Sequence, residues 1–145
     1  MGLAMAAAAV EAGAARVEVW GPFEASVAEL RRTRESPRLP GWRIPDSIEF
    51  AHEPLVFASG TILVNAIPTQ FMRPVWSGIA THVPAGALVV STAKGLEIGS
   101  GDRPSEILVD VLADPVVCAL SGPTIAAELI QRLPALMVAA CSAKD

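Results

Sequence analysis

The sequence has little charge and no extended run of one sign. Lysine and arginine together number 11, aspartate and glutamate 15, and the formal net charge of the 145 residues is -4. Proteins that bind nucleic acid cluster basic side chains on one face, because neutralising phosphates supplies much of the affinity. No such cluster is present, so we expect no nucleic-acid partner.

Long uninterrupted hydrophobic runs are also missing. Hydrophobic residues make up 52% of the chain, but no window reaches the roughly 18 consecutive apolar residues that indicate a membrane span. The alanine-rich segment 1–15 carries Glu11 and lacks both the positive start and the cleavage pattern of a secretory signal. We therefore expect a soluble, cytoplasmic protein.

Cysteine and histidine are scarce and scattered. Cys118 and Cys141 form no CxxC pair, and His52 and His82 are isolated, so the ligand spacing of a zinc site is missing. Both cysteines stand in apolar runs, VVCAL and VAACS. We expect them to be reduced and to pack as small hydrophobic side chains.

What the chain does contain is an alternation of helical and strand-like segments. The expected helices are 2–12, 24–34, 70–80 (with Thr69 as N-cap), 104–112 and 125–132, and the expected strands are 16–20, 47–50, 61–67, 87–91, 116–120 and 135–141. This pattern is typical of a mostly parallel sheet with helices on both faces. We predict an α/β fold, Rossmann-like and doubly wound, forming one dinucleotide-binding domain over 1–145.

Polar motifs follow three of the predicted strands. They read IPTQF (67–71), STAKG (91–95) and SGPT (121–124). Because parallel strands share a direction, their carboxyl ends meet at one edge of the sheet, where open α/β sheets bind ligands. Lys94 adds a compact positive charge, and the helix after 124 adds free N–H groups. The combination suits a phosphorylated or carboxylated small molecule.

Each of these motifs also has a purely structural interpretation. Lys94 can be a solvated lysine on a loop, and Ser121 to Thr124 an ordinary connection from strand to helix. Phe71 can lie against a flat cofactor ring or pack in the core on the first turn of a helix. Trp20 closes a strand, where packing is the commoner role. The residues alone leave these alternatives open.

Taken in order, the motifs resemble the N-terminal domain of NAD(P)-dependent glycerol-3-phosphate dehydrogenase. The resemblance covers nearly the entire chain, and STAKG and SGPTIA together are its most specific part. The pair argues against ketopantoate reductase, a dehydrogenase of similar build. The motifs that carry it are VWGP (19–22), IPTQFMRPV (67–75), VVSTAKGLE (89–97), RPSEIL (103–108) and LSGPTIAAEL (120–129).

The resemblance implies reversible hydride transfer between NAD or NADP and dihydroxyacetone phosphate, forming glycerol 3-phosphate, a precursor of glycerophospholipids. The choice between NAD and NADP stays open, because Gly21 and Pro22 follow the second strand where an acidic or basic residue would decide it. The implied substrate contacts are Lys94, Gly122 and Thr124, and the implied cofactor contacts are Gly2, Pro68, Phe71, Lys94 and Ala126.

The chain departs from the family pattern at both ends. Gly2 aligns with the last glycine of the GxGxxG turn, so the first strand and the other glycines of that turn are not present. The helical C-terminal domain, which carries the general acid/base, is not present either. We therefore assign no catalytic residue and expect the chain to be inactive alone, with the other domain supplied in trans or with a homo-oligomer. The alternative is an inactive remnant that binds a partner chain or a phosphorylated metabolite.

Overall fold

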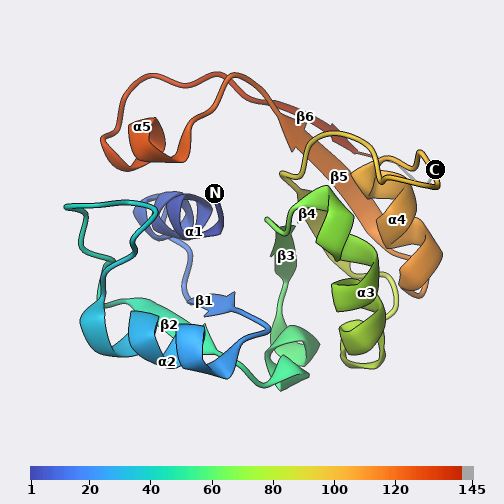
Figure 1. Ribbon diagram of the computed structural model, residues 1–145, viewed down its shortest axis with the longest axis horizontal. Coiled ribbons are helices and arrows are strands. Elements are labelled where there is room, and N and C mark those ends of the chain that lie inside the picture. The colour runs from blue at the N-terminus through green and yellow to red at the C-terminus, as the bar shows by residue number, and fades with distance from the viewer. Residues whose placement is uncertain (142–145) are drawn as a thin grey trace. The chain divides into compact units, whose positions relative to one another are not determined.

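The computed structural model describes residues 1–141, and the chain forms two compact units (Figure 1). Unit 1 comprises Met1–Val56 and Thr124–Ala135. Unit 2 comprises Phe57–Pro123 and the segment from Leu136 onward. Each unit has its own sheet and its own helices. The α/β class predicted from the sequence is confirmed.

Unit 1 is built on a pair of parallel strands. Its elements are α1 (Gly2–Glu11), β1 (Val17–Trp20), α2 (Glu24–Thr33), β2 (Ile48–Ala51) and α5 (Ala126–Ile130). β1 and β2 pair in register from Val17 opposite Ile48 to Trp20 opposite Ala51. Half of the residues of α1 are alanine, the best helix former, and the chain leaves the helix through Gly13 at a φ of 86°.

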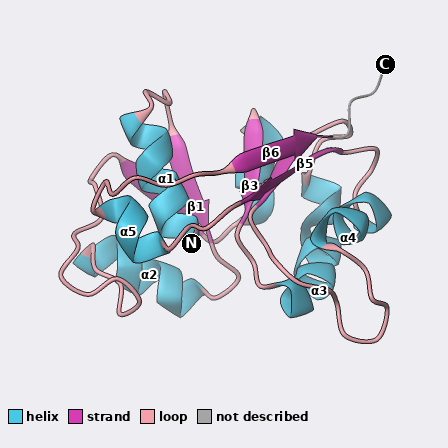
Figure 2. Cartoon of the chain, turned by 90° about the horizontal axis from the view of Figure 1, so that it is seen from above, coloured by secondary structure: helices cyan, strands magenta, loops and turns pink. Residues whose placement is uncertain are grey.

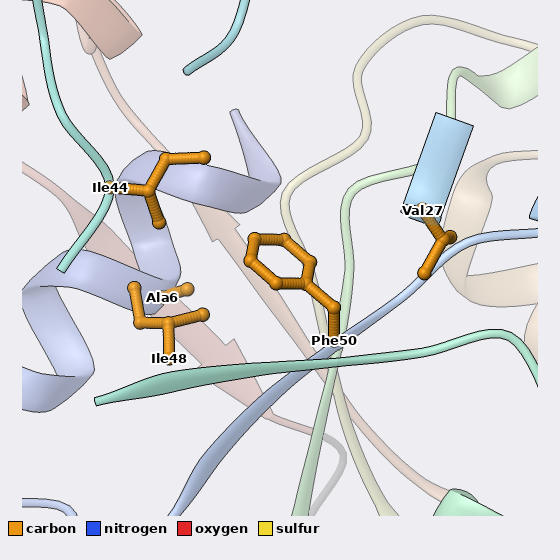
Figure 3. Close-up of a cluster of buried hydrophobic side chains, with 5 residues drawn as sticks. All are labelled: Ala6, Val27, Ile44, Ile48 and Phe50. Carbon is orange, nitrogen blue, oxygen red and sulfur yellow. The ribbon is translucent and has the colours of Figure 1, made fainter. Parts of the chain in front are cut away.

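The core of unit 1 lies between its helices and the β1–β2 pair. Ala6 of α1 packs with Val27 of α2 and with Ile44, Ile48 and Phe50, and Figure 3 shows these side chains together. Ile44 and Ile48 have no exposed surface. The small alanine side chains let the backbone of α1 approach the strands closely. The larger isoleucine and phenylalanine side chains fill the rest of the core.

Unit 2 contains a four-stranded sheet of order β3-β4-β5-β6. The first three strands are parallel, and β6 is antiparallel to β5; the two lie side by side in Figure 2. The strands are β3 (Ile62–Asn65), β4 (Leu88–Ser91), β5 (Val116–Ser121) and β6 (Val138–Cys141). The helices are α3 (Thr69–Ile79), the short 3-10 helix η2 (Ala80–His82) and α4 (Pro104–Val111).

Apolar side chains hold α3 and α4 against this sheet. Met72 and Trp76 of α3 recur at helical spacing and are buried, as are Val89 of β4 and Ile107 and Leu108 of α4. α3 and α4 pack on each other, as Figure 1 shows. The packing brings the starts of both helices to the ends of the parallel strands.

The structure corrects one local prediction and contains one element that the sequence does not predict. Helix α3 begins at Thr69 with Pro68 in the N-cap position, so the prediction of Thr69 as N-cap is wrong. The Thr69 hydroxyl instead donates to the carbonyl oxygen of Lys94. A 3-10 helix at Pro54–Ser59 was also not predicted, because its sequence, PLVFAS, lacks a helical period long enough to detect.

The prediction that both cysteines are reduced is wrong in this structure. Cys118 of β5 and Cys141 of β6 face each other across the antiparallel pair and form a disulfide. The sequence could not reveal this, because the two residues are 23 positions apart and meet only through strand register.

In residues 1–141, no helix combines the length and the apolar character needed to cross a membrane.

Candidate functional site

A hollow of about 360 Å³ lies at the carboxyl ends of β4 and β5 in unit 2. Ser91 is the last residue of β4 and Ser121 the last of β5, so the two residues line it from adjacent strands. The start of α4 closes another side. The residues that line it are Ser91, Ala93, Lys94, Gly95, Arg103, Pro104, Ser105, Ala119 and Ser121.

Lys94 connects the two strand ends that form the hollow. Its Nζ donates a hydrogen bond of 2.7 Å to the carbonyl oxygen of Gly122. Its own carbonyl oxygen accepts one of 2.7 Å from Thr69. All three predicted strand-end motifs therefore meet at one place, as the parallel order of β3, β4 and β5 requires. The role of Lys94 in binding a ligand stays a prediction.

Gly122 has a structural reason to be glycine. A Cβ atom at this position would collide with the carbonyl oxygen of Leu136, in the segment that leads into β6. The backbone of the turn after β5 therefore approaches that segment too closely for any side chain. The close approach also fixes the direction of the Gly122 carbonyl that accepts from Lys94.

Arg103 and Ser105 are lining residues that the sequence analysis did not single out. The backbone N–H of Arg103 donates to Glu106 Oε2 at 2.8 Å, and its guanidinium bonds Oε1 at 2.6 Å. These bonds to Arg103, the side-chain bond foremost, lower the pKa of Glu106 to about 2. In the sequence, the RPSE motif indicates this helix start, because proline is favoured at the first helical position and the glutamate caps the helix N-terminus.

A buried network of polar side chains connects the ends of β3 and β4 with α3. Asn65, the last residue of β3, donates to Ser91 Oγ at 2.9 Å and accepts from the Trp76 indole at 3.0 Å. The hydroxyl of Thr92 donates to the Asn65 carbonyl oxygen at 3.0 Å. Fully bonded networks of this kind rigidify a core. In the sequence, the only sign of this network is the single asparagine within the apolar run TILVNAI.

Phe71 and Pro68 lie at the start of α3, also in unit 2. The ring of Phe71 is 61% exposed, so the interpretation of Phe71 as a core aromatic is wrong. An exposed ring directly after a strand end is free to lie against a planar group. Pro68 holds the N-cap position of α3. Their assignment as cofactor contacts stays a prediction.

The remaining predicted site residues belong to unit 1. Gly2 is the first residue of α1, Ala126 is the first residue of α5, and Thr124 precedes α5. α1 and α5 pack on each other, and Arg132 bonds Glu11 between them. The ligand roles of Gly2, Thr124 and Ala126 stay predictions.

Trp20 and His52 connect the ends of β1 and β2. The Trp20 indole donates to the His52 carbonyl oxygen at 2.6 Å, and His52 Nδ1 lies 3.1 Å from the Gly21 carbonyl oxygen. These contacts agree with the packing role expected for Trp20. Across residues 1–141, no group of three or more His, Cys, Asp and Glu side chains is arranged to hold a metal ion.

Helices packed on parallel strands whose carboxyl ends border a hollow define a Rossmann-like α/β class of domain. A solved structure agrees with this class. Glycerol-3-phosphate dehydrogenase from Coxiella burnetii superimposes on 97% of this chain and 43% of its own, with a TM-score of 0.85. The sequence identity is 22%, so this likeness concerns the fold.

The sequence comparisons identify the family. The family model described as the N-terminus of NAD-dependent glycerol-3-phosphate dehydrogenase matches residues 1–145, and the chain belongs to this family. The cofactor of the family is accordingly NAD or NADP.

Two curated relatives show how much of the enzyme the chain represents. Glycerol-3-phosphate dehydrogenase [NAD(P)+] 2 of Lactobacillus delbrueckii subsp. bulgaricus is 35% identical over 132 residues, covering 86% of this chain and 39% of the relative. The Mycobacterium tuberculosis enzyme of the same name is 36% identical over 147 residues, covering 97% of this chain and 43% of the relative. The chain thus spans about two fifths of the length of these relatives.

Proposed function

We propose that residues 1–145 form the cofactor-binding and substrate-phosphate-binding domain of a glycerol-3-phosphate dehydrogenase. The domain would take part in reversible hydride transfer between NAD(P)H and dihydroxyacetone phosphate. The observation that carries the proposal is the hydrogen bond from Lys94, a residue that lines the hollow, to the carbonyl oxygen of Gly122. It brings together the two motifs on which the family resemblance depends.

The hollow has the chemistry to hold a phosphate group. Lys94 contributes positive charge, and Ser105 and Ser121 line the hollow with hydroxyl-bearing side chains. Charge-assisted hydrogen bonds of this kind are roughly twice as strong as neutral ones. Because Glu106 already neutralises Arg103, Lys94 is the cation we assign to the phosphate.

Five residues are assigned to the cofactor. Phe71 fits a planar ring, because its own ring is largely exposed at a strand end. The other contacts we assign are Gly2, Pro68 and Ala126, together with Lys94. When bound, the nicotinamide supplies the hydride. We assign Thr124 with Gly122 and Lys94 to the substrate.

The chain supplies binding groups rather than the general acid/base of the reaction. We assign no catalytic residue to residues 1–145 and propose that activity requires the remaining part of the enzyme, because the chain spans 39% of the length of a curated relative. We place the reaction in the cytoplasm, where it would supply glycerol 3-phosphate for glycerophospholipids. The alternative, an inactive remnant that binds a partner, is an outcome of the test below.

The test is a titration of the full chain with glycerol 3-phosphate and, separately, with NADH, monitored by calorimetry. We expect Lys94→Met to weaken glycerol 3-phosphate binding at least about tenfold, because a hydrogen bond to a charged group contributes roughly 1.5–3 kcal/mol. Lys144→Met is the matched control, because Lys94 and Lys144 are the lysines of the chain and both variants remove one charge.

Unchanged affinity in Lys94→Met, with Lys144→Met also unchanged, would remove Lys94 from the phosphate site. A wild-type chain that binds neither compound would favour the inactive remnant.

A further inference from the structure

The loop that follows Lys94 has little intrinsic order. It runs from 95 to 102 with no helix or strand, and Gly95, Gly99 and Gly101 all have positive φ angles. Glycine gains more conformational freedom on release than any other residue. The loop therefore needs external contacts to hold Lys94 at one position.

Polar side chains at the start of α3 provide those contacts. Thr69 donates to the Lys94 carbonyl oxygen at 2.7 Å. Gln70 donates from Nε2 to the Leu96 carbonyl oxygen at 2.8 Å, and its Oε1 accepts from the Ile98 backbone N–H at 2.8 Å. One helical turn thus holds the loop backbone at alternate residues, 94, 96 and 98.

Arg73, one turn further along α3, bonds three carboxylates. Its Nε donates to Glu97 at 2.9 Å, its Nη2 to Asp102 at 2.7 Å and its Nη1 to Asp110 at 3.3 Å. Glu97 and Asp102 stand near the two ends of the loop, and Asp110 is on α4. The planar fork of a guanidinium presents separate N–H donors to all three carboxylates in a fixed geometry, whereas the ammonium of a lysine is a compact point charge.

The loop also has hydrogen bonds of its own. The Ser100 hydroxyl donates to Glu97 at 2.7 Å, and the Glu97 backbone N–H donates to the Asp102 carbonyl oxygen at 2.9 Å. The Ser100 hydroxyl, followed by Arg73, lowers the pKa of Glu97, so its carboxylate remains charged at neutral pH. The Glu97 side chain is only 13% exposed, which strengthens the pairing.

The fold of unit 2 has a separate source of stability. Met72 and Trp76 of α3 are buried, and so is Val89 of the sheet. Arg73 and Gln70 contact the loop and α4 rather than this core. Their removal should therefore release the loop and leave the sheet in place.

We propose that Arg73 and Gln70 are positioning residues for Lys94. They hold loop 95–102 so that the Lys94 ammonium stays at the Gly122 carbonyl and ready to meet a phosphate group. The proposal rests on the function proposed above. A pre-positioned lysine binds a phosphate group more tightly, because the loop is already ordered in the folded protein and no conformational entropy is lost on binding.

The experiment compares the wild-type chain with Arg73→Met, Arg73→Lys and Gln70→Leu. Arg16→Met is the matched control, because Arg16 also bridges two glutamates but lies in unit 1. Calorimetry measures the affinity for glycerol 3-phosphate. NMR with 13C-labelled lysine follows the Lys94 Cε signal, assigned with Lys94→Arg, and hydrogen exchange follows the backbone amides of Glu97 and Gly101.

We expect Arg73→Met and Gln70→Leu to weaken the affinity about tenfold, to shift the Lys94 signal and to accelerate exchange in loop 95–102. The amides of β4 and β5 should stay protected in both. Arg73→Lys should give only partial recovery, because it keeps the charge but not the fork. Arg16→Met should behave as wild type.

The proposal is overturned if the loop exchanges faster while the affinity and the Lys94 signal stay as in wild type. Full recovery in Arg73→Lys would also overturn it, since charge alone would then suffice. If the wild-type chain binds no glycerol 3-phosphate, the proposed function fails. In that case the NMR signal of Lys94 and the hydrogen exchange of loop 95–102 still test whether Arg73 and Gln70 position Lys94. Gln70→Leu leaves the ion network intact and keeps the test valid if Arg73→Met does not fold.

Discussion

At the scale of single residues, Gly122 shows how one position serves packing and chemistry together. The collision that a Cβ would make with Leu136 explains the glycine without any ligand. The carbonyl of the same residue holds the Lys94 ammonium. A side chain at 122 would push the turn away from Leu136, and the acceptor for Lys94 would move with it.

We predict that Gly122→Ala destabilises the chain by roughly 1–3 kcal/mol, the usual cost of overpacking. Gly78→Ala is the control, because Gly78 lies inside α3 with open space around its added Cβ. That substitution should stabilise the helix by roughly 0.5–1 kcal/mol. Urea unfolding of both variants measures the difference, and a Gly122→Ala chain as stable as wild type would contradict the packing argument.

At the scale of elements, β6 closes the sheet of unit 2 in the opposite direction to the other strands. Its register brings Cys141 opposite Cys118, and the disulfide joins β6 to β5. Cys118 is buried and Cys141 is exposed. The bond therefore holds an exposed edge strand to the strand that ends at Ser121, a residue of the candidate site.

We predict that reduction of the Cys118–Cys141 disulfide lowers the free energy of unfolding by roughly 3 kcal/mol. The two cysteines are 23 residues apart, and breaking the bond between them increases the conformational entropy of the unfolded chain. The double variant Cys118→Ala/Cys141→Ala should have the same free energy of unfolding as the reduced wild type. Adding the reductant should not change its stability. Urea unfolding with and without a phosphine reductant makes the comparison. Thiols that react with a labelling reagent in the untreated, unfolded chain would refute the bond.

At the scale of the whole molecule, apolar burial is divided between two units. Ile48 packs with Ala6, Val27, Ile44 and Phe50, all of unit 1. Ile107 is fully buried in unit 2, on a helix that packs against α3 and β5. Each unit therefore has a core that depends on its own side chains.

We predict that Ile48→Ala and Ile107→Ala each cost roughly 2–5 kcal/mol, since both delete fully buried side chains. Each should accelerate hydrogen exchange mainly within its own unit, because the lost contacts are local to that unit. Exchange by mass spectrometry on peptides of both units provides the measurement. Equal acceleration in both units by either variant would show that they unfold as one body.

Several features of the fold and the site could be predicted from the sequence alone. Runs such as TILVNAI and ALVVS indicate buried strands because side-chain period and propensity are local properties. The parallel order then requires IPTQF, STAKG and SGPT to end at one edge, which the bond from Lys94 to Gly122 shows for the latter two. The family membership follows from the same motifs.

Other features depended on the tertiary structure. The sequence shows that Arg73, Glu97, Asp102 and Asp110 exist, but only the packing of α3 beside α4 brings them together. In the same way, Cys118 meets Cys141 through strand register, and Phe71 is exposed because the buried face of α3 is taken by Met72 and Trp76. Local patterns determine which elements form, whereas contacts between distant residues depend on how those elements pack, and packing decides how Lys94 is held.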